Sequence, residues 1–165
     1  MRLSAIVKTV CSAVIAFGLV SNAQAGDETF QATLKLLTSV ISITQDQSLD
    51  FGQAIVGTNQ TLTVGALDGS AAVFSAQGVS SKTATASVVE TSITMKTGNG
   101  KGKKKKIVVD NFTLGGTGIT GADQVDFIAG NGTVSDIRVG ATANVEANDI
   151  AGDYVGTATF RVIYN

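Results

Sequence analysis

The sequence predicts an all-β domain of the sandwich type, and three observations support this fold class. Glycine occupies 19 of 165 positions, only 15 % of residues are charged and 44 % are apolar, a composition that favours strands and turns. Apolar and polar residues alternate with a period of two along much of the chain, and no helical periodicity persists beyond residue 25. Turn signals separate these short runs, as in a β-sandwich.

The clearest strand is the C-terminal run from Tyr154 to Tyr164, in which every second residue belongs to one face. Aromatic and apolar residues on that face predict a strand buried on one side. Seven further strands are expected at 41–43 running toward 49–51, 60–64, 71–76, 87–95, 105–114, 124–128 and 141–145. Glycine-containing turns at 68–69, 98–100, 115–118 and 131–132 separate several of them.

The residue types that are missing exclude several function classes. The chain has no His and one Cys, which excludes Ser-His-Asp and Cys-His catalysis, an intrachain disulfide and a CxxC zinc site. Residues 116–121 fit the GxGxxG pattern, but the pattern requires a helix after it and a strand is expected there. We therefore expect no enzyme, no cofactor and no metal site.

Residues 1–25 have the three parts of a secretory signal peptide. Arg2 and Lys8 are basic, residues 13–20 are apolar, and residues 23–25 form an A-x-A cleavage site. Cleavage there removes the single cysteine, Cys11, and no later segment is apolar enough to span a membrane. We expect a signal peptide at 1–25, an N-terminal extension at 26–37 and one sandwich domain at 38–165.

The extension alternates in the manner of a strand. Its apolar residues are Phe30, Ala32, Leu34 and Leu36, and the alternation changes phase at 36–37. A phase change of one residue reverses the two faces of a strand. The segment is therefore either one strand with a bulge or a separate strand that pairs outside its own domain.

Several short motifs occur in a characteristic order: 49–52 (LDFG), 109–112 (VDNF), 139–145 (VGATANV), 152–157 (GDYVGT) and 162–165 (VIYN). Together they resemble a bacterial family of secreted, fimbrillin-like β-sandwich proteins that is known as a domain of unknown function. The layout is also similar to that of chaperone–usher pilins, including the spore-coat-U-like archaic type. Those pilins have a penultimate Tyr and a Gly fourteenth from the end, as Tyr164 and Gly152 are here.

The resemblance implies an immunoglobulin-like, pilin-type antiparallel sandwich that lacks its last strand. A periplasmic chaperone would lend a strand, and the extension of the next subunit would replace it at an outer-membrane usher. The implied function is that of a structural subunit of a pilus or fimbria-like fibre, with a role in adhesion or biofilm. The implied location is the periplasm and then the surface of a Gram-negative-type bacterium.

The same resemblance assigns residues to each role. Phe30, Ala32, Leu34 and Leu36 would be the donor side chains. Asn165 would present the C-terminal carboxylate to basic residues of the chaperone. The C-terminal strand and chaperone-binding candidates are Gly152, Tyr154, Gly156, Ala158, Phe160, Val162, Tyr164 and Asn165.

One strong charge run remains, and it has two interpretations. It consists of Lys101, Lys103, Lys104, Lys105 and Lys106, and it runs into the strand expected at 105–114. The run is either a solvated hairpin loop that protects a sheet edge or a contact for an anionic surface or polysaccharide. No aromatic residue lies among the lysines, so no specific nucleic acid is expected. The alternative function is therefore a free-standing periplasmic or surface sandwich that binds an anionic polysaccharide or partner.

Overall fold

The computed structural model describes residues 31, 34, 40–98, 106–128 and 130–165. The chain divides into two units, Met1–Leu36 and Leu37–Asn165, and all the described strands lie in the second. The described residues contain strands and no helix, which confirms the all-β prediction. The strands are β1 (Ser42–Gln47), β2 (Gln60–Val64), β3 (Ala72–Gln77), β4 (Thr83–Val88), β5 (Ser92–Lys96), β6 (Lys106–Gly115), β7 (Gln124–Asp126), β8 (Thr133–Val145) and β9 (Phe160–Tyr164).

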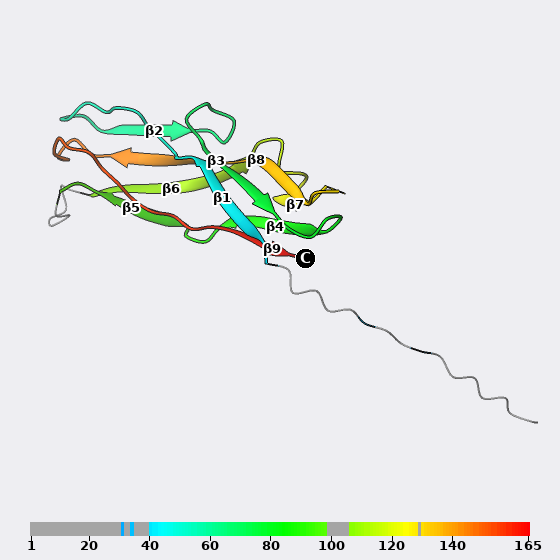
Figure 1. Ribbon diagram of the computed structural model, residues 1–165. Coiled ribbons are helices and arrows are strands. Elements are labelled where there is room, and N and C mark those ends of the chain that lie inside the picture. The colour runs from blue at the N-terminus through cyan, green and yellow to red at the C-terminus, as the bar shows by residue number, and fades with distance from the viewer. Residues whose placement is uncertain (1–30, 32–33, 35–39, 99–105, 129) are drawn as a thin grey trace, which may run out of the picture. The chain divides into compact units, whose positions relative to one another are not determined.

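The larger sheet is built around β8, its longest strand. Its order is β1-β3-β8-β6-β5, and all its pairs are antiparallel (Figure 1). One edge of β8 pairs with β6, and the other is shared by β3 in its first half and β2 in its second half. Gly140 lies where β3 gives way to β2, and a Cβ there would be 2.4 Å from the carbonyl oxygen of Val64. Only glycine fits this junction without a shift of backbone.

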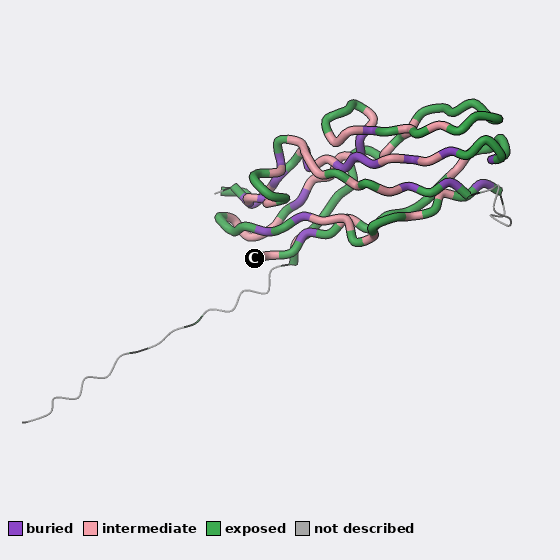
Figure 2. Tube along the Cα trace, turned by 180° about the vertical axis from the view of Figure 1, so that it is seen from behind, coloured by how far each residue is buried: buried purple, intermediate pink, exposed green. Residues whose placement is uncertain are grey.

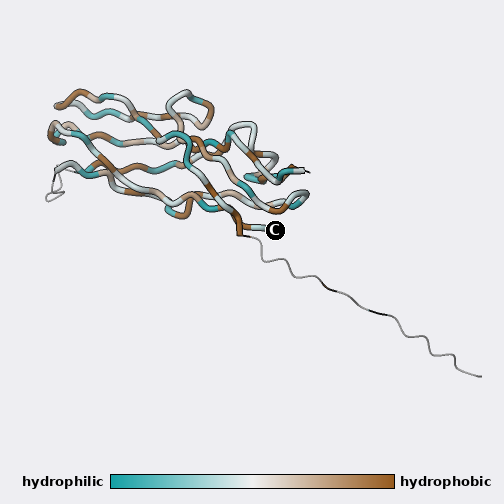
Figure 3. Tube along the Cα trace, in the orientation of Figure 1, coloured by the Kyte–Doolittle hydropathy of each residue, from teal (hydrophilic) through white to brown (hydrophobic). Residues whose placement is uncertain are grey.

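The smaller sheet has the order β7-β4-β9 and packs on one part of the larger sheet. Residues of both sheets share one apolar cluster, which includes Ala76, Ala84, Phe127, Ile137 and Val162. A second cluster lies on the inner face of β6 and β8 and includes Ile107, Val109, Ala141, Ala143 and Val145. Buried and apolar residues recur along the strands of both sheets rather than in one segment (Figures 2 and 3). This arrangement confirms a sandwich-type fold.

A bulge explains why the alternation in β8 changes phase. Val134 and Ile137 are both buried, although they are three residues apart, and the register against β3 shifts between these positions. Asp136 has a φ of 57° at the bulge, and its Oδ2 accepts hydrogen bonds from the N–H and hydroxyl of Thr117, each at 2.8 Å. The Arg138 side chain and these two donors lower the pKa of Asp136 to about 2.

The structure corrects two strand predictions. The run 87–95 is not one strand, because β4 ends at Val88 and β5 begins at Ser92, and the two strands belong to different sheets. The last strand is shorter than 154–164, because β9 begins at Phe160. The residues before it form only an isolated bridge between Val155 and Lys96 in the larger sheet. The chain therefore crosses from one sheet toward the other within the run that was predicted as one strand.

Candidate functional site: the opening between the first and last strands

An edge strand of the larger sheet, β1, and an edge strand of the smaller sheet, β9, lie on the same side of the sandwich. Within the described residues, β1 pairs only with β3 and β9 pairs only with β4. Phe74 of β3 stacks on Phe160 of β9 with ring centroids 4.4 Å apart, and Ile41, just before β1, packs on the cluster that contains Val162. The two edges therefore flank the same part of the core (Figure 1).

The backbone of β9 offers hydrogen-bonding groups to a further strand. The N–H of Asn165 donates to Thr83 O at 3.2 Å, and Thr159 O accepts from the N–H of Val89 at 2.9 Å, so odd-numbered residues of this run face β4. Because backbone groups alternate in direction along a strand, those of Phe160 and Val162 face the opposite side. The Val162 side chain is nevertheless 8 % exposed, so this edge combines a buried apolar side chain with outward backbone groups.

In the larger sheet, the edge strand β1 has side chains that no other described strand covers. All six of its residues are exposed, including Ile43 at 36 %. A strand on one face of a sandwich normally buries every second side chain. The inner side of β1 is therefore not covered by another described strand.

Beyond these edges lies a cavity of about 570 Å³. Residues 49–56, which follow β1, and residues 149–154, which approach β9, both line it. Its remaining lining comes from the inner face of the larger sheet: Leu62, Met95, Ile107, Ala143 and Val145. We call the two strand edges and this cavity the β1–β9 opening.

Residues 152–159, which lead from the larger sheet to β9, form the crossing segment, and specific contacts fix its position. The Glu90 carboxylate accepts hydrogen bonds from the N–H and hydroxyl of Thr159 at 2.7 and 2.8 Å. These bonds hold the pKa of Glu90 below its ordinary value. Gly152 approaches buried Thr97 so closely that a Cβ would lie 2.4 Å from the threonine hydroxyl oxygen. The position of the crossing segment is thus set at both of its ends.

The far end of β9 is held by Tyr164. Its hydroxyl oxygen accepts a hydrogen bond from the Val79 N–H at 2.6 Å, and its ring packs against Phe127 with centroids 5.7 Å apart. A Cβ on Gly78 would lie 2.6 Å from the same hydroxyl oxygen, so glycine permits this approach. These contacts tie the edge strand β9 to the loop between β3 and β4.

Replacing Tyr164 by Phe is expected to lower the free energy of unfolding by about 1–2 kcal/mol, because the part-buried Val79 N–H loses its acceptor. Urea denaturation measures this change. Tyr154→Phe is the matched control, since its hydroxyl donates to Ile150 O at an exposed position and a smaller loss is expected. Equal losses in the two variants would contradict the holding role of Tyr164.

The structure places the sequence-predicted residues as follows. Of the C-terminal candidates, Phe160, Val162 and Tyr164 lie in β9 with half-buried or buried side chains, and Gly152, Tyr154, Gly156 and Ala158 lie in the crossing segment. The Asn165 side chain accepts a hydrogen bond from the Thr85 hydroxyl at 2.6 Å. Leu34 is 84 % exposed. Lys106 is the exposed first residue of β6, within the strand expected at 105–114. The candidates outside the described residues are Phe30, Ala32, Leu36, Lys101, Lys103, Lys104 and Lys105.

Sequence reasoning did not assign residues 49–56 to the site, although they line the cavity. Ile55 and Val56 are 75 % and 54 % exposed. Their signal was present in the sequence as two adjacent apolar residues in a segment without strand alternation. Adjacent exposed apolar residues can form part of an interaction surface when they belong to a larger apolar patch.

Residues 41–164 match the model of a family described as a domain of unknown function, DUF4402, and the chain belongs to this family. No curated protein and no solved structure matches the chain. In the part of the chain that the structure describes, no helix has the length and apolar character needed to cross a membrane. Across the same residues, no three His, Cys, Asp or Glu side chains are grouped so as to hold a metal ion.

Proposed function

We propose that this protein is a structural subunit of a secreted pilus- or fimbria-like surface fibre, assembled by donor-strand exchange. The observation that carries the proposal is the β1–β9 opening, in which two strand edges flank one core, together with a cavity whose lining on the larger sheet is apolar. An extended segment from another chain would add a strand to β9 and place alternate side chains against the inner face of the larger sheet.

The expected donor has the chemistry that this opening requires. Phe30, Ala32, Leu34 and Leu36 alternate over seven residues, so their side chains would point to one face along about 20 Å of extended chain. The outward backbone groups of Phe160 and Val162 would supply the hydrogen-bonding register. Before assembly, a periplasmic chaperone would occupy the same edge, and an outer-membrane usher would mediate the exchange. The proposed location is the periplasm and then the cell surface, because a signal peptide is predicted at residues 1–25.

An exposed edge explains why such a subunit would need a partner. An unpaired strand edge is a template for aggregation unless it is short, charged or covered. β9 carries one charged side chain, Arg161, beside the apolar residues Ile163 and Val162. Donor-strand exchange covers this edge permanently and at the same time links the subunits into a fibre.

Donor complementation tests the proposal. A synthetic peptide of residues 26–37 is added to the chain that lacks residues 27–36, and thermal unfolding is followed. The peptide is expected to raise the free energy of unfolding by about 2.7 kcal/mol at a concentration of 100 Kd, because it binds only the folded subunit. The control is the same peptide with Phe30→Asp. If neither peptide changes the melting temperature at any concentration, the donor assignment is wrong.

A further inference from the structure

The outer face of the larger sheet carries two lysines in direct cross-strand register. Lys96 of β5 pairs with Lys106 of β6, and both are exposed. The preceding pair, Met95 and Ile107, belongs to the inner cluster, so the two lysines point to the outer face. Like charges directly opposite each other on an antiparallel pair are destabilising.

Neither lysine forms an ion pair within the described part of the chain, where the only ion pair joins Arg138 and Asp136. Two positive charges therefore stand on neighbouring strands, with Cβ atoms about 4.5–5.5 Å apart. The register of β6 against β8, in which Val108 pairs with Asn144, places Glu146 on the same face near Lys106 without an ion pair between them. An anionic group bound between them would remove the repulsion.

A row of hydrogen-bonding side chains lies next to this lysine pair on the same face. Thr61 of β2 pairs with Asn144 of β8, Asn144 with Val108 of β6, and Val108 with Thr94 of β5. The Asn144 amide donates to the Asp110 carboxylate at 3.3 and 3.4 Å, so its orientation is fixed. Val108, at 45 % exposed, is the apolar member of the row.

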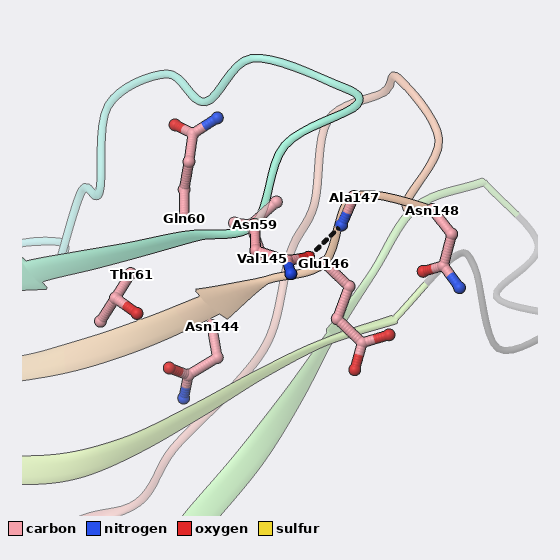
Figure 4. Close-up of a pocket in the computed structure, with 8 residues that line it drawn as sticks. All are labelled: Asn59, Gln60, Thr61, Asn144, Val145, Glu146, Ala147 and Asn148. Carbon is pink, nitrogen blue, oxygen red and sulfur yellow. Dashed lines mark hydrogen bonds between the residues drawn. The ribbon is translucent and has the colours of Figure 1, made fainter.

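Thr61 and Asn144 also border a hollow of about 550 Å³ (Figure 4). Five of its eight lining residues carry an amide or hydroxyl side chain, and Glu146 supplies one carboxylate. The side-chain Oδ1 of Asn59 accepts a hydrogen bond from the Ala147 N–H at 2.7 Å, so the side-chain NH₂ of Asn59 points away from that bond. The lining residues are Asn59, Gln60, Thr61, Asn144, Val145, Glu146, Ala147 and Asn148.

These groups select a ligand that has both hydroxyls and negative charge. Amides, hydroxyls and the Glu146 carboxylate exchange hydrogen bonds with sugar hydroxyls, and the lysine pair attracts a carboxylate. A nucleic acid fits less well, because the lysine pair and the adjacent row contain no aromatic side chain for base stacking and only two lysines for phosphates.

We propose that the outer face of the larger sheet, from this hollow to Lys96 and Lys106, binds an acidic polysaccharide. The sugar carboxylates contact the lysine pair, and the sugar hydroxyls contact Thr61, Asn144 and Thr94. The lysine pair and the row of Thr61, Asn144 and Thr94 lie on the face opposite to the inner surface of the larger sheet. Of the residues that line the hollow, only Val145 also lines the cavity of the β1–β9 opening, so binding to the lysine pair and the row does not require strand exchange. In a fibre the site would recur once per subunit, and multivalent contact would strengthen weak single-site binding.

The experiment measures binding of the full secreted chain to sodium polygalacturonate by titration calorimetry, with neutral dextran as the uncharged comparison. Lys96→Gln with Lys106→Gln is expected to weaken polygalacturonate binding about tenfold, the equivalent of 1.4 kcal/mol. Lys82→Gln alters an exposed lysine that belongs neither to the lysine pair nor to the adjacent row, and it is expected to leave binding unchanged. Thr61→Ala is expected to weaken binding without changing its salt dependence.

Three outcomes would overturn the proposal. One is unchanged binding in the Lys96/Lys106 double variant, which would leave the lysines as a solvated pair only. Another is loss of binding only when Lys101, Lys103, Lys104 and Lys105 become Gln. The third is that duplex DNA binds at least as tightly as polygalacturonate, with the same salt slope and the same variant effects. Multimer formation is measured in parallel on the same variants, so a failure of the fibre proposal is recognised separately.

Discussion

The chain without residues 27–36 is expected to lose all heat-resistant multimers and to remain a monomer that accepts a donor strand. Burial of Phe30, Leu34 and Leu36 contributes roughly 1.5–3 kcal/mol each, or on the order of 6 kcal/mol together. Whole domains are stable by only about 5–15 kcal/mol. A link of this size between subunits would survive conditions that separate ordinary weak complexes.

Electrophoresis of unheated samples measures the multimer ladder directly. Phe30→Asp is the single-residue version of the deletion, because a carboxylate buried in an apolar site is strongly unfavourable. Lys35→Asp is the matched control, since residue 35 lies on the opposite face of the expected donor strand. A complete ladder from the deletion variant would refute the donor role of the extension.

The second large effect is expected at the acceptor side, with Ala158→Asp. Ala158 is exposed in the crossing segment and precedes Phe160 by two residues. A carboxylate there would be buried by an incoming donor, so the variant should fold normally and fail to accept a strand. The control is Thr157→Asp, which places the same charge on the exposed residue next to Ala158. Neighbouring residues of an extended chain point to opposite sides, so this carboxylate is expected to stay in solvent.

Mixing the two variants distinguishes a donor–acceptor link from general loss of association. Phe30→Asp retains the opening but has no competent donor, and Ala158→Asp retains the donor but has no competent opening. Each alone should be monomeric, whereas an equimolar mixture should form a one-to-one dimer and nothing larger. Analytical ultracentrifugation gives the masses. A mixture that stays monomeric, or one that forms a full ladder, would contradict the proposed exchange.

The sequence predicted strands well where large apolar residues alternate. β2 has the expected bounds, and β3 and β6 begin and end within a residue or so of expectation. The alternation of Phe160, Val162 and Tyr164 is also confirmed in β9. These strands have one buried face lined by Val, Ile, Leu or aromatic residues, which makes the period of two visible.

The sequence missed most of β4 and predicted only the last part of β8, for identifiable physical reasons. β4 buries Ala84 and Ala86, which alternate with Thr83, Thr85 and Ser87. Alanine differs too little in hydropathy from threonine and serine to reveal the alternation. β8 was expected only over 141–145, because the bulge at Asp136 places Val134 and Ile137 on one face at a spacing of three. A bulge depends on tertiary contacts, here with Thr117, that no local pattern contains.

The candidate site was predictable only in part. The C-terminal residues were recognised from their alternation, but the sequence did not reveal that the chain crosses between sheets before Phe160. That crossing depends on Glu90, which binds Thr159 from 69 residues away. The lysine pair on the outer face also depends on a contact between separate segments, because the register of β5 against β6 places Lys96 beside Lys106. The sequence alone did not reveal this register.

The pairing of distant strands has a kinetic consequence. β4 meets β9 through contacts such as Thr85 with Asn165, which are 80 residues apart, and β2 meets β8 across 79 residues, as at Thr63 and Thr142. Chains rich in such distant contacts fold slowly, because long loops must close before their contacts form. The smaller sheet is therefore incomplete until residues 160–164 have paired with β4. During that delay β4 has only the three-residue β7 beside it, and slow folding with open edges is where aggregation competes best.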